Sequence, residues 1–241
     1  MDERIHLGKW TEEELTSLME DASALASPGE RIAFLSGFFL NTKYREATLE
    51  GDMTEEVCVI HLEEVDCVTF IEYVEAMRRA KSFEEFRQRL KEVRYRSGNV
   101  SYAERNHFFT DWKAHNADYI VDVTPYIHPG RSKEVSKRLN DKGDGTFFVP
   151  GVVSTLREVT YLPSVYVDDE AVDKLETGDY IGIYSKIEGL DVSHTGIFIR
   201  EEGRALLRHA SSQKKYRKVI DEDFLEYLRA KAGIVVLRPR D

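Results

Sequence analysis

The chain has only two cysteines, no long apolar run and no surplus of positive charge. Its apolar runs are a few residues long, far short of the roughly 20 residues that cross a bilayer, which excludes a transmembrane span. The net charge of -10 argues against non-specific binding to nucleic acid or anionic lipid, although a local basic groove stays open. Two cysteines, Cys58 and Cys67, decide little about the cellular compartment.

The residue spacing of a metal site is also lacking. Cys58, His61 and Cys67 could suggest one, but zinc sites pair cysteines about two to four residues apart, and there is no second such pair. The turn at 140–145 resembles a calcium loop only superficially, because it lacks the closing acidic residue. We therefore expect no metal and no cofactor.

What is present suits one sizeable globular domain. With 241 residues and 41% hydrophobic content the chain can bury a substantial core, and it has no repeats or long linkers. We expect one catalytic domain over 1–241, with an N-terminal helical segment at 1–40 packed on it. The predicted class is α+β, with helices grouped around an antiparallel sheet.

Local signals place the elements. Capping boxes begin helices at Thr11 and Ser82, and the break at 27–29 precedes a second helix that ends near Leu40. Further helices are expected at 131–139, 169–175 and 221–231. Strands are expected at 57–62, 118–124, 146–149, 159–162, 164–167, 178–184, 196–200, 204–210 and 233–237.

The chain is organised around 64–73, which reads as the start of a helix. Asp66 is a good N-cap, and a helical apolar stripe follows it. Cys67 then lies in the first turn, where the helix dipole favours a thiolate and lowers a cysteine pKa from about 8.5 towards neutrality. Cys67 is therefore a candidate nucleophile, and a reduced thiol. The alternative is that it is a small buried hydrophobic residue.

Two histidines on strands strengthen this interpretation. His194 stands at the head of the strand at 196–200, and His209 lies on the next strand, beyond the turn at 201–203. If the two strands form a hairpin, both histidines lie near the same end of the sheet. A cysteine nucleophile needs an imidazole base and a third group that orients the base, so Cys67, His194 and His209 supply all three roles.

These motifs resemble the NlpC/p60 superfamily of papain-like cell-wall hydrolases, in its amidase-like branch, domain-of-unknown-function family 1460. The resemblance runs from about Phe38 to Pro239. It is carried by four motifs in one order, namely those at 66–72, 102–112, 189–196 and 207–212. It implies a papain-like core with a partly closed antiparallel barrel, the nucleophile at a helix N-terminus and extra helices around it.

The resemblance also implies an activity, cleavage of the amide between N-acetylmuramic acid and L-alanine in peptidoglycan fragments. His194 would be the base, His209 would orient it, and a tyrosine upstream of the cysteine, here Tyr44, would line the oxyanion pocket or cleft. Where related endopeptidases that clasp a free amine often carry serine after the cysteine, this chain has Val68. Asp66 and Tyr44 remain, so the amine clamp is incomplete, which favours the sugar-linked amide.

Residues 97–116 mix aromatic and polar side chains. Arg105, Asn106 and His107 could bind a sugar or its carboxylate, and Ser193 is a further candidate for binding substrate. The alternative for this segment is an amphipathic helix whose aromatic residues Phe108, Phe109 and Trp112 belong to the core. We expect both to hold, with the aromatic residues mostly buried and Arg105, Asn106 and His107 nearer the cleft. Tyr44 likewise could be a half-buried packing residue.

Other functions stay open at this point. One is a γ-D-glutamyl endopeptidase or an acyltransferase on the same triad, and another is a non-catalytic muropeptide-binding module. We expect a monomer whose partners are muropeptides, with no nucleic acid and no membrane span. Residues 1–10 lack a signal-peptide pattern. The expected location is therefore cytoplasmic if the chain is complete, and the periplasm or cell envelope if a signal was removed.

Overall fold

The computed structural model describes residues 3–49 and 56–241 and divides the chain into two compact units. The first unit comprises the chain up to Arg105 together with Arg208–Asp221, and the second comprises Asn106–Leu207 and Glu222–Asp241. The chain thus passes between the units three times, because the segment 208–221 returns to the first. Whether the two units fold as one domain is untested, so the one-domain expectation stays a prediction. Met1, Asp2 and the segment 50–55 lie outside the described residues.

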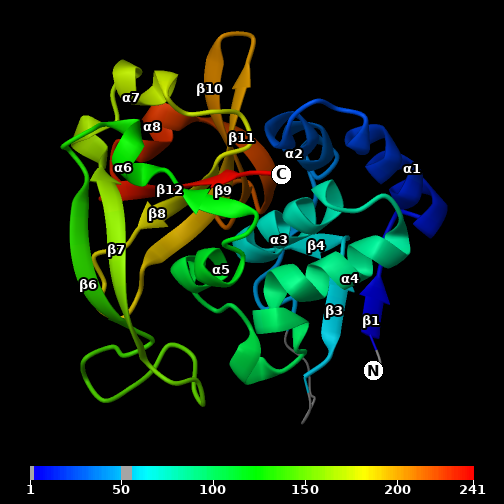
Figure 1. Cartoon of the computed structure of the whole chain (residues 1–241), viewed down its shortest axis with the longest axis horizontal. Coiled ribbons are helices and arrows are strands. Elements are labelled where there is room, and N and C mark those ends of the chain that lie inside the picture. The colour runs from blue at the N-terminus through cyan, green and yellow to red at the C-terminus, as the bar shows by residue number, and fades with distance from the viewer. Residues whose placement is uncertain (1–2, 50–55) are drawn as a thin grey trace. The chain divides into compact units, whose positions relative to one another are not determined.

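The first unit is mainly helical (Figure 1). Its helices are α1 (Glu12–Ser23), α2 (Pro28–Gly37), α3 (Cys67–Arg78) and α4 (Phe83–Arg94), with short 3-10 turns η1 (Arg96–Gly98) and η2 (Tyr102–Glu104). Its short strands are β1 (Glu3–His6), β2 (Lys43–Tyr44), β3 (Cys58–His61) and β4 (Glu64–Val65). Strand β1 pairs with β3 in parallel, and β2 pairs in parallel with β4 and antiparallel with β11 (Lys218–Asp223).

Side chains at the helix starts explain these boundaries. Thr11, Ser27, Asp66 and Ser82 each accept a hydrogen bond from the backbone N–H three residues later. The predicted starts at Thr11, Asp66 and Ser82 are confirmed. In α4 the reciprocal half of the box differs, because Glu85 accepts from the N–H of Lys81 rather than that of Ser82. Helix α3 is the centre of this unit, since every residue from Thr69 to Arg78 is buried.

The second unit is built on an antiparallel sheet. Its strands are β5 (Ile120–Asp122), β6 (Lys133–Leu139), β7 (Thr155–Pro163), β8 (Tyr180–Tyr184), β9 (Val192–Glu201) and β12 (Gly233–Pro239). Its helices are α5 (Phe109–His115), α6 (Thr124–Ile127), α7 (Asp169–Asp173) and α8 (Phe224–Leu228), with the 3-10 turn η3 (Ser164–Tyr166). Strand β10 (Arg204–Ser211) begins in this unit and ends in the first.

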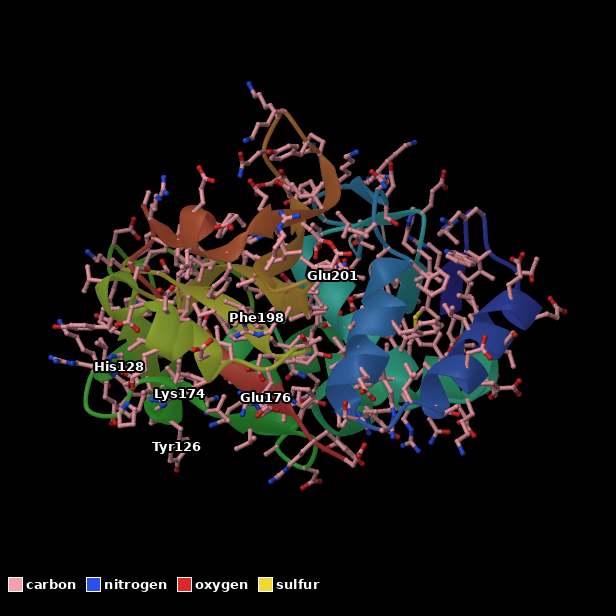
Figure 2. All side chains as sticks on the ribbon, turned by 90° about the horizontal axis from the view of Figure 1, so that it is seen from above. Tyr126, His128, Lys174, Glu176, Phe198 and Glu201 are labelled. Atoms are coloured by element: carbon pink, nitrogen blue, oxygen red, sulfur yellow. The ribbon has the colours of Figure 1, made fainter. Side chains whose placement is uncertain are left out.

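The sheet order is β10-β9-β8-β12-β7-β6, with β5 added beside β12. The pairs β9–β8, β8–β12, β12–β7 and β7–β6 are antiparallel, and β6 and β7 form a long hairpin (Figure 1). The result is a mixed α+β fold with a curled, half-barrel sheet. Ile181, Phe198, Leu207 and Phe224 are among the residues that fill its core. Tyr126, by contrast, is 72% exposed and points away from the ribbon (Figure 2).

Some predicted elements are wrong. The expected helix at 131–139 is strand β6, and the expected strand at 164–167 is mostly the 3-10 turn η3. The expected strand at 146–149 is reduced to an isolated bridge between Phe147 and Asp141. Pairing with β7 along the whole of β6 overrides the local helix preference of a charged segment. The helix expected at 221–231 is confirmed only for Phe224–Leu228, because the chain before it continues as β11.

Within 3–49 and 56–241 there is no helix with the length and apolar character needed to cross a membrane.

Candidate active site

The first residue of α3 is Cys67, at the end of a short strand and directly after an N-cap. The Asp66 carboxylate accepts hydrogen bonds from the N–H groups of Val68 and Thr69 at 2.9 and 2.8 Å. The Thr69 hydroxyl accepts in return from the N–H of Asp66 at 2.9 Å. This reciprocal box fixes the chain on both sides of Cys67, and it leaves the cysteine half-buried rather than enclosed.

Burial raises the pKa of the Asp66 carboxyl, and the hydrogen bonds from Thr69 and Val68 counteract part of that rise. The neighbouring Val68 is 36% exposed, so the residue after Cys67 is apolar and open to solvent. Cys58 differs sharply from Cys67. It is buried in β3, and burial raises the pKa of its thiol. Of the two cysteines, only Cys67 is open to a reagent or substrate.

Tyr44 lies close to Cys67 in the same unit. It pairs in register with Val65, two residues before the cysteine. Burial, followed by the negative charges of Cys67, Glu46 and Asp66, raises the pKa of Tyr44 to about 12, although Arg217 acts in the opposite direction. The guanidinium of Arg217 stands 4.7 Å from the centre of the tyrosine ring. The phenol therefore stays protonated over the physiological range and can donate a hydrogen bond.

His209 is buried on β10, in the part of that strand that belongs to the first unit. Arg208, its neighbour on the opposite face, pairs with Asp221 through two contacts of 2.8 Å and donates to the α2 residues Ala33 and Ser36 at 3.2 Å. Alternation along the strand therefore turns His209 away from α2. These contacts fix the strand that carries the imidazole.

Arg105, Asn106 and His107 follow η2 and are placed differently from one another. The Arg105 guanidinium forms a bidentate ion pair with Glu56, with contacts of 2.6 and 2.7 Å. The Asn106 side-chain oxygen lies 2.6 Å from Nδ1 of His115, and Asn106 is buried, whereas His107 is half-buried. A substrate carboxylate would have to compete with Glu56 for Arg105. The expected burial of Phe108, Phe109 and Trp112 is confirmed.

His194 lies in β9, opposite Ile183 of β8. Burial, together with the positive charge of Lys231, lowers the pKa of His194 to about 4. Its ring centre is 6.3 Å from that of Tyr227. The imidazole is therefore neutral at pH 7 and able to accept a proton. A thiolate partner would raise this pKa again, because an opposite charge favours the imidazolium.

A β-bulge precedes His194. Ile183 pairs with His194 while Tyr184 pairs with Val192, so Ser193 is the extra residue on β9. Ser193 is exposed, and its hydroxyl donates a long bond of 3.4 Å to the carbonyl of Ile183. A bulge re-aims the side chains beside it and is common next to active sites. It sets the direction in which His194 leaves the strand.

Asp191 anchors the chain in front of this bulge. Its buried carboxylate accepts from the N–H and hydroxyl of Thr110 at 2.7 and 2.8 Å, and from the N–H of Val192 at 2.7 Å. Burial raises the pKa of Asp191, and the bonds from Thr110 lower it in part. Sequence reasoning assigned no role to Asp191, nor to Glu56, the partner of Arg105. An acidic residue directly before a strand gives only a weak local signal for such an anchor.

The described part of the chain contains no group of three or more histidine, cysteine or acidic side chains arranged to hold a metal ion.

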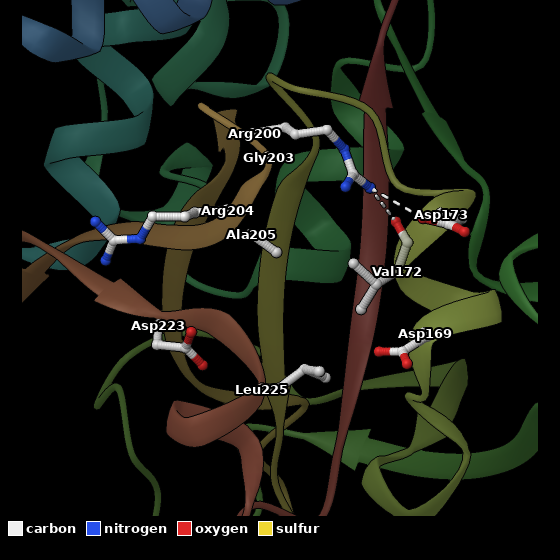
Figure 3. Close-up of a pocket in the computed structure, with 9 residues that line it drawn as sticks. All are labelled: Asp169, Val172, Asp173, Arg200, Gly203, Arg204, Ala205, Asp223 and Leu225. Atoms are coloured by element: carbon white, nitrogen blue, oxygen red, sulfur yellow. Dashed lines mark hydrogen bonds and ion pairs between the residues drawn. The ribbon is translucent and has the colours of Figure 1, made fainter.

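A pocket of about 410 Å³ opens at the other end of β9 (Figure 3). It is lined by side chains from α7, β9, β10, the end of β11 and the start of α8, among them Val172, Arg200 and Asp223. Arg200 donates to the carbonyl of Val172 at 2.8 Å. Arg200 stands six residues after His194, which is about 20 Å along an extended strand. The pocket is therefore remote from His194, and we assign it no part in the candidate site.

Residues 34–234 match the AmiA-like family, described as N-acetylmuramoyl-L-alanine amidase-like. That match spans most of the chain and includes Cys67, His194 and His209. The chain therefore belongs to the AmiA-like family. Among curated proteins none matches the chain.

Solved structures agree with this placement. A Legionella pneumophila protein of domain-of-unknown-function family 1460 superposes with a TM-score of 0.81 over 95% of this chain and 94% of its own, and at 22% identity it shows the fold alone. An N-acetylmuramoyl-L-alanine amidase from Bacteroides uniformis gives 0.74 at 27% identity, over 94% and 99%. A Bacteroides fragilis protein described as a proposed xylanase gives 0.70 at 30% identity, over 84% and 98%.

Proposed function

We propose that this chain is an N-acetylmuramoyl-L-alanine amidase that acts on peptidoglycan fragments through Cys67. The observation that carries the proposal is the position of this half-buried cysteine at the first residue of α3, directly after the Asp66 cap, in a chain of the AmiA-like family. A helix N-terminus favours the thiolate, which is the nucleophilic form. The name of the Bacteroides uniformis neighbour supports the choice of bond.

In the proposed mechanism His194 removes the proton of the Cys67 thiol. The thiolate attacks the carbonyl carbon of the lactyl group, and the resulting oxyanion accepts hydrogen bonds from the Cys67 amide and the Tyr44 hydroxyl. The His194 imidazolium then gives its proton to the leaving amine of L-alanine, so that a thioester remains. Water, deprotonated by His194, hydrolyses that thioester and restores the thiol. His209 is the proposed orienting residue for His194.

The residues around Cys67 favour this bond over a γ-glutamyl one. Val68 presents methyl groups where a clamp for a free amine would need a hydroxyl, and it is 36% exposed beside the cysteine. A substrate whose L-alanine nitrogen is acylated has no ammonium to bind there. Arg105, Asn106, His107 and Ser193 remain proposed substrate-binding residues, with the reservation that Arg105 already pairs with Glu56.

The test is mass spectrometry of muropeptides digested by the wild type, Cys67→Ser and Cys58→Ser. We expect the wild type and Cys58→Ser to release two products, N-acetylmuramic acid with a free lactyl carboxylate and a peptide that begins with L-alanine. We expect Cys67→Ser to release neither. Cys58→Ser is the matched control, because it alters the buried thiol and leaves Cys67 in place.

Each alternative gives a different product. Cleavage after γ-D-glutamate indicates an endopeptidase, and a new amide or ester on an added acceptor indicates an acyltransferase. Retention of muropeptide without cleavage indicates a binding module. Xylan is included as a test substrate because of the description of the Bacteroides fragilis neighbour. Glycoside hydrolysis requires two carboxyl groups that flank the scissile bond. Full activity in Cys67→Ser would overturn the cysteine mechanism.

A further inference from the structure

Lys137 is a lysine buried in the middle of β6. Only 4% of the residue is exposed, and its ammonium donates hydrogen bonds to three carbonyl oxygens of a single loop. The acceptors are Ser185 and Ile187, both at 2.7 Å, and Leu190 at 2.9 Å. These three bonds use all three protons of the ammonium. The loop 185–190 is therefore wrapped around one fixed positive charge.

The loop 185–190 connects β8 to β9. Within it, the N–H of Ile187 donates to the hydroxyl of Ser185 at 3.1 Å, and the N–H of Leu190 donates to the carbonyl of Ile187 at 3.3 Å. The N–H of Ser185 donates to the carbonyl of Asp191 at 2.9 Å, and the N–H of Asn140 donates to that of Gly189 at 2.8 Å. Gly189 has φ +74°, and a Cβ placed there would lie 2.2 Å from the carbonyl oxygen of Asp141. Lys137 adds the contact that draws both ends of the loop to one point, because the carbonyls of Ser185, Ile187 and Leu190 converge on its ammonium.

This loop leads directly to the bulge that aims His194. Leu190 is bonded to Lys137, and Asp191 is held by Thr110. Ser193 is the bulged residue, and His194 follows it. Only three residues lie between Leu190 and His194. A shift of the loop would therefore pass into the bulge and change the direction of the imidazole, because the bulge is where the alternation of the strand is reset.

We propose that Lys137 is a positioning residue for His194, and that its ammonium acts as a built-in cation at the centre of the carbonyl cage of the 185–190 loop. The inference rests on the proposed function, because it assigns importance to the direction of His194. This positioning role of Lys137 differs from a purely structural role in one respect. A general stabilising contact would affect the whole unit equally, whereas this one acts on the loop and on the histidine that follows it.

The cage also predicts a specific chemical rescue. Removing the side chain beyond Cβ leaves three carbonyls converging on a space that had held an ammonium, and converging carbonyls attract a cation that can donate hydrogen bonds. A small alkylammonium ion supplied from solution has the same donor group. Sodium chloride at equal ionic strength supplies charge without N–H donors, so it separates rescue from a salt effect.

The experiment compares the full-length wild type with Lys137→Met, Lys137→Ala and Lys133→Ala. Met keeps the length of the side chain and removes the charge, while Ala opens the space for rescue. Lys133 is the matched control, because it lies on the same face of β6 and is exposed. The readouts are hydrogen exchange of the amides at 187–192, the imidazole NMR signals of His194 against pH, and kcat/KM on a muropeptide.

We expect exchange at 187–192 to be faster by about tenfold or more in both Lys137 variants, since the local opening free energy falls, with α3 unchanged. The His194 titration should move up from about 4, towards that of a free histidine. The value of kcat should fall by about tenfold or more with little change in KM, because misplacing a base affects the chemical step. Ethylammonium should restore part of the loss in Lys137→Ala, and Lys133→Ala should match the wild type.

Three results would overturn the inference. They are unchanged exchange in the loop, an altered loop with an unaltered His194 titration, and equal recovery with ethylammonium and sodium chloride. Hydrogen exchange and NMR need no turnover. If both respond as expected while the wild type cleaves no muropeptide, the proposed function fails and the positioning of His194 by Lys137 stands.

Discussion

The contrast between Cys67 and Cys58 shows how position alone separates two identical side chains. Both lie in the first unit, yet Cys58 is buried in β3, whereas Cys67 begins α3 and is half-buried. Burial raises the pKa of Cys58 and so disfavours its thiolate. Cys67 instead has the backbone N–H groups of a helix start around it. A pH-dependent alkylation difference between them is the simplest sign of activation at Cys67.

His194 gives a prediction about stability at low pH. Its pKa is lowered to about 4 in the folded protein, against about 6.5 in an unfolded chain. Between these values the unfolded state binds more protons, so this group makes the protein less stable as the pH falls from 6.5 towards 4. Above about pH 6.5 it adds no pH dependence. The loss at low pH has an upper bound of about 3 to 4 kcal/mol, and solvent screening makes it smaller.

The measurement is urea unfolding of the wild type and His194→Asn at several values between about pH 4 and pH 7. We expect the free energy of unfolding of the wild type, taken relative to the variant, to decrease as the pH falls through this range. Asp66 and Asp191 have raised pKa values, so they make the folded state more stable as the pH falls, which is opposite to the effect of His194. Their contributions are the same in both proteins and cancel in the difference. Parallel pH curves for the two proteins would show that the His194 pKa is not lowered by folding.

At the scale of elements, α3 carries the candidate nucleophile because its N-terminus is fixed from both directions. The Asp66 carboxylate accepts two backbone N–H groups, and the Thr69 hydroxyl closes the box. From Thr69 onward the helix is buried, and its Glu72 forms an ion pair with Arg94 of α4 at 2.7 Å. The buried helix after Cys67 and the Asp66 cap before it together leave Cys67 little freedom to move.

Removing the cap should therefore change both the free energy of unfolding and the alkylation rate of the Cys67 thiol. We expect Asp66→Ala to lower the free energy of unfolding by about 1–2 kcal/mol and Asp66→Asn by less, because Asn also accepts at an N-cap. Asp66→Ala should also change the alkylation rate of Cys67. Ser82→Ala is the control. It removes the cap of α4, where Ser82 accepts from the N–H of Glu85, and should cost about 1 kcal/mol with no change in Cys67 alkylation. Equal alkylation in all four proteins would show that the cap does not act on the thiol.

At the scale of the whole molecule, the chain order of the two units is the main feature. The segment 208–221 leaves the second unit, completes the first and returns. Arg208 is its first residue and Asp221 its last, and the two form an ion pair with side chains only 6% and 20% exposed. Arg208 also bonds to α2 through Ala33 and Ser36. One guanidinium thus joins both ends of the segment to helix α2.

We expect Arg208→Met to lower the free energy of unfolding by about 3 kcal/mol, because it leaves Asp221 largely buried without its partner. The double variant Arg208→Met/Asp221→Asn should recover part of this loss. Urea unfolding of the single and double variants measures the coupling. Lys174→Met is the control, since its ion pair with Glu170 is exposed and should contribute little to stability. If Arg208→Met lowers the free energy of unfolding no more than Lys174→Met does, Arg208 does not hold the segment 208–221 in place.

The sequence by itself determined what depends on neighbours within three or four residues. The starts of α1, α3 and α4 follow from side chains that bond to their own backbone, and the turn at 201–203 separates two β-prone runs. Placing Cys67 at a helix start needed nothing beyond that local pattern. Such bonds join residues that are close in the chain, so forming them costs little conformational entropy and the sequence alone predicts them.

Tertiary structure alone decided the rest. Residues 133–139 became a strand because β7 pairs with them along their whole length, and that pairing buried Lys137. Arg105 met Glu56, 49 residues away, and Asp191 met Thr110, 81 residues away. A buried charge or carbonyl must find a partner wherever the fold brings one, because leaving it unpaired costs more than any local preference supplies. Partners this distant leave no periodicity or cap in the sequence by which they could be foreseen.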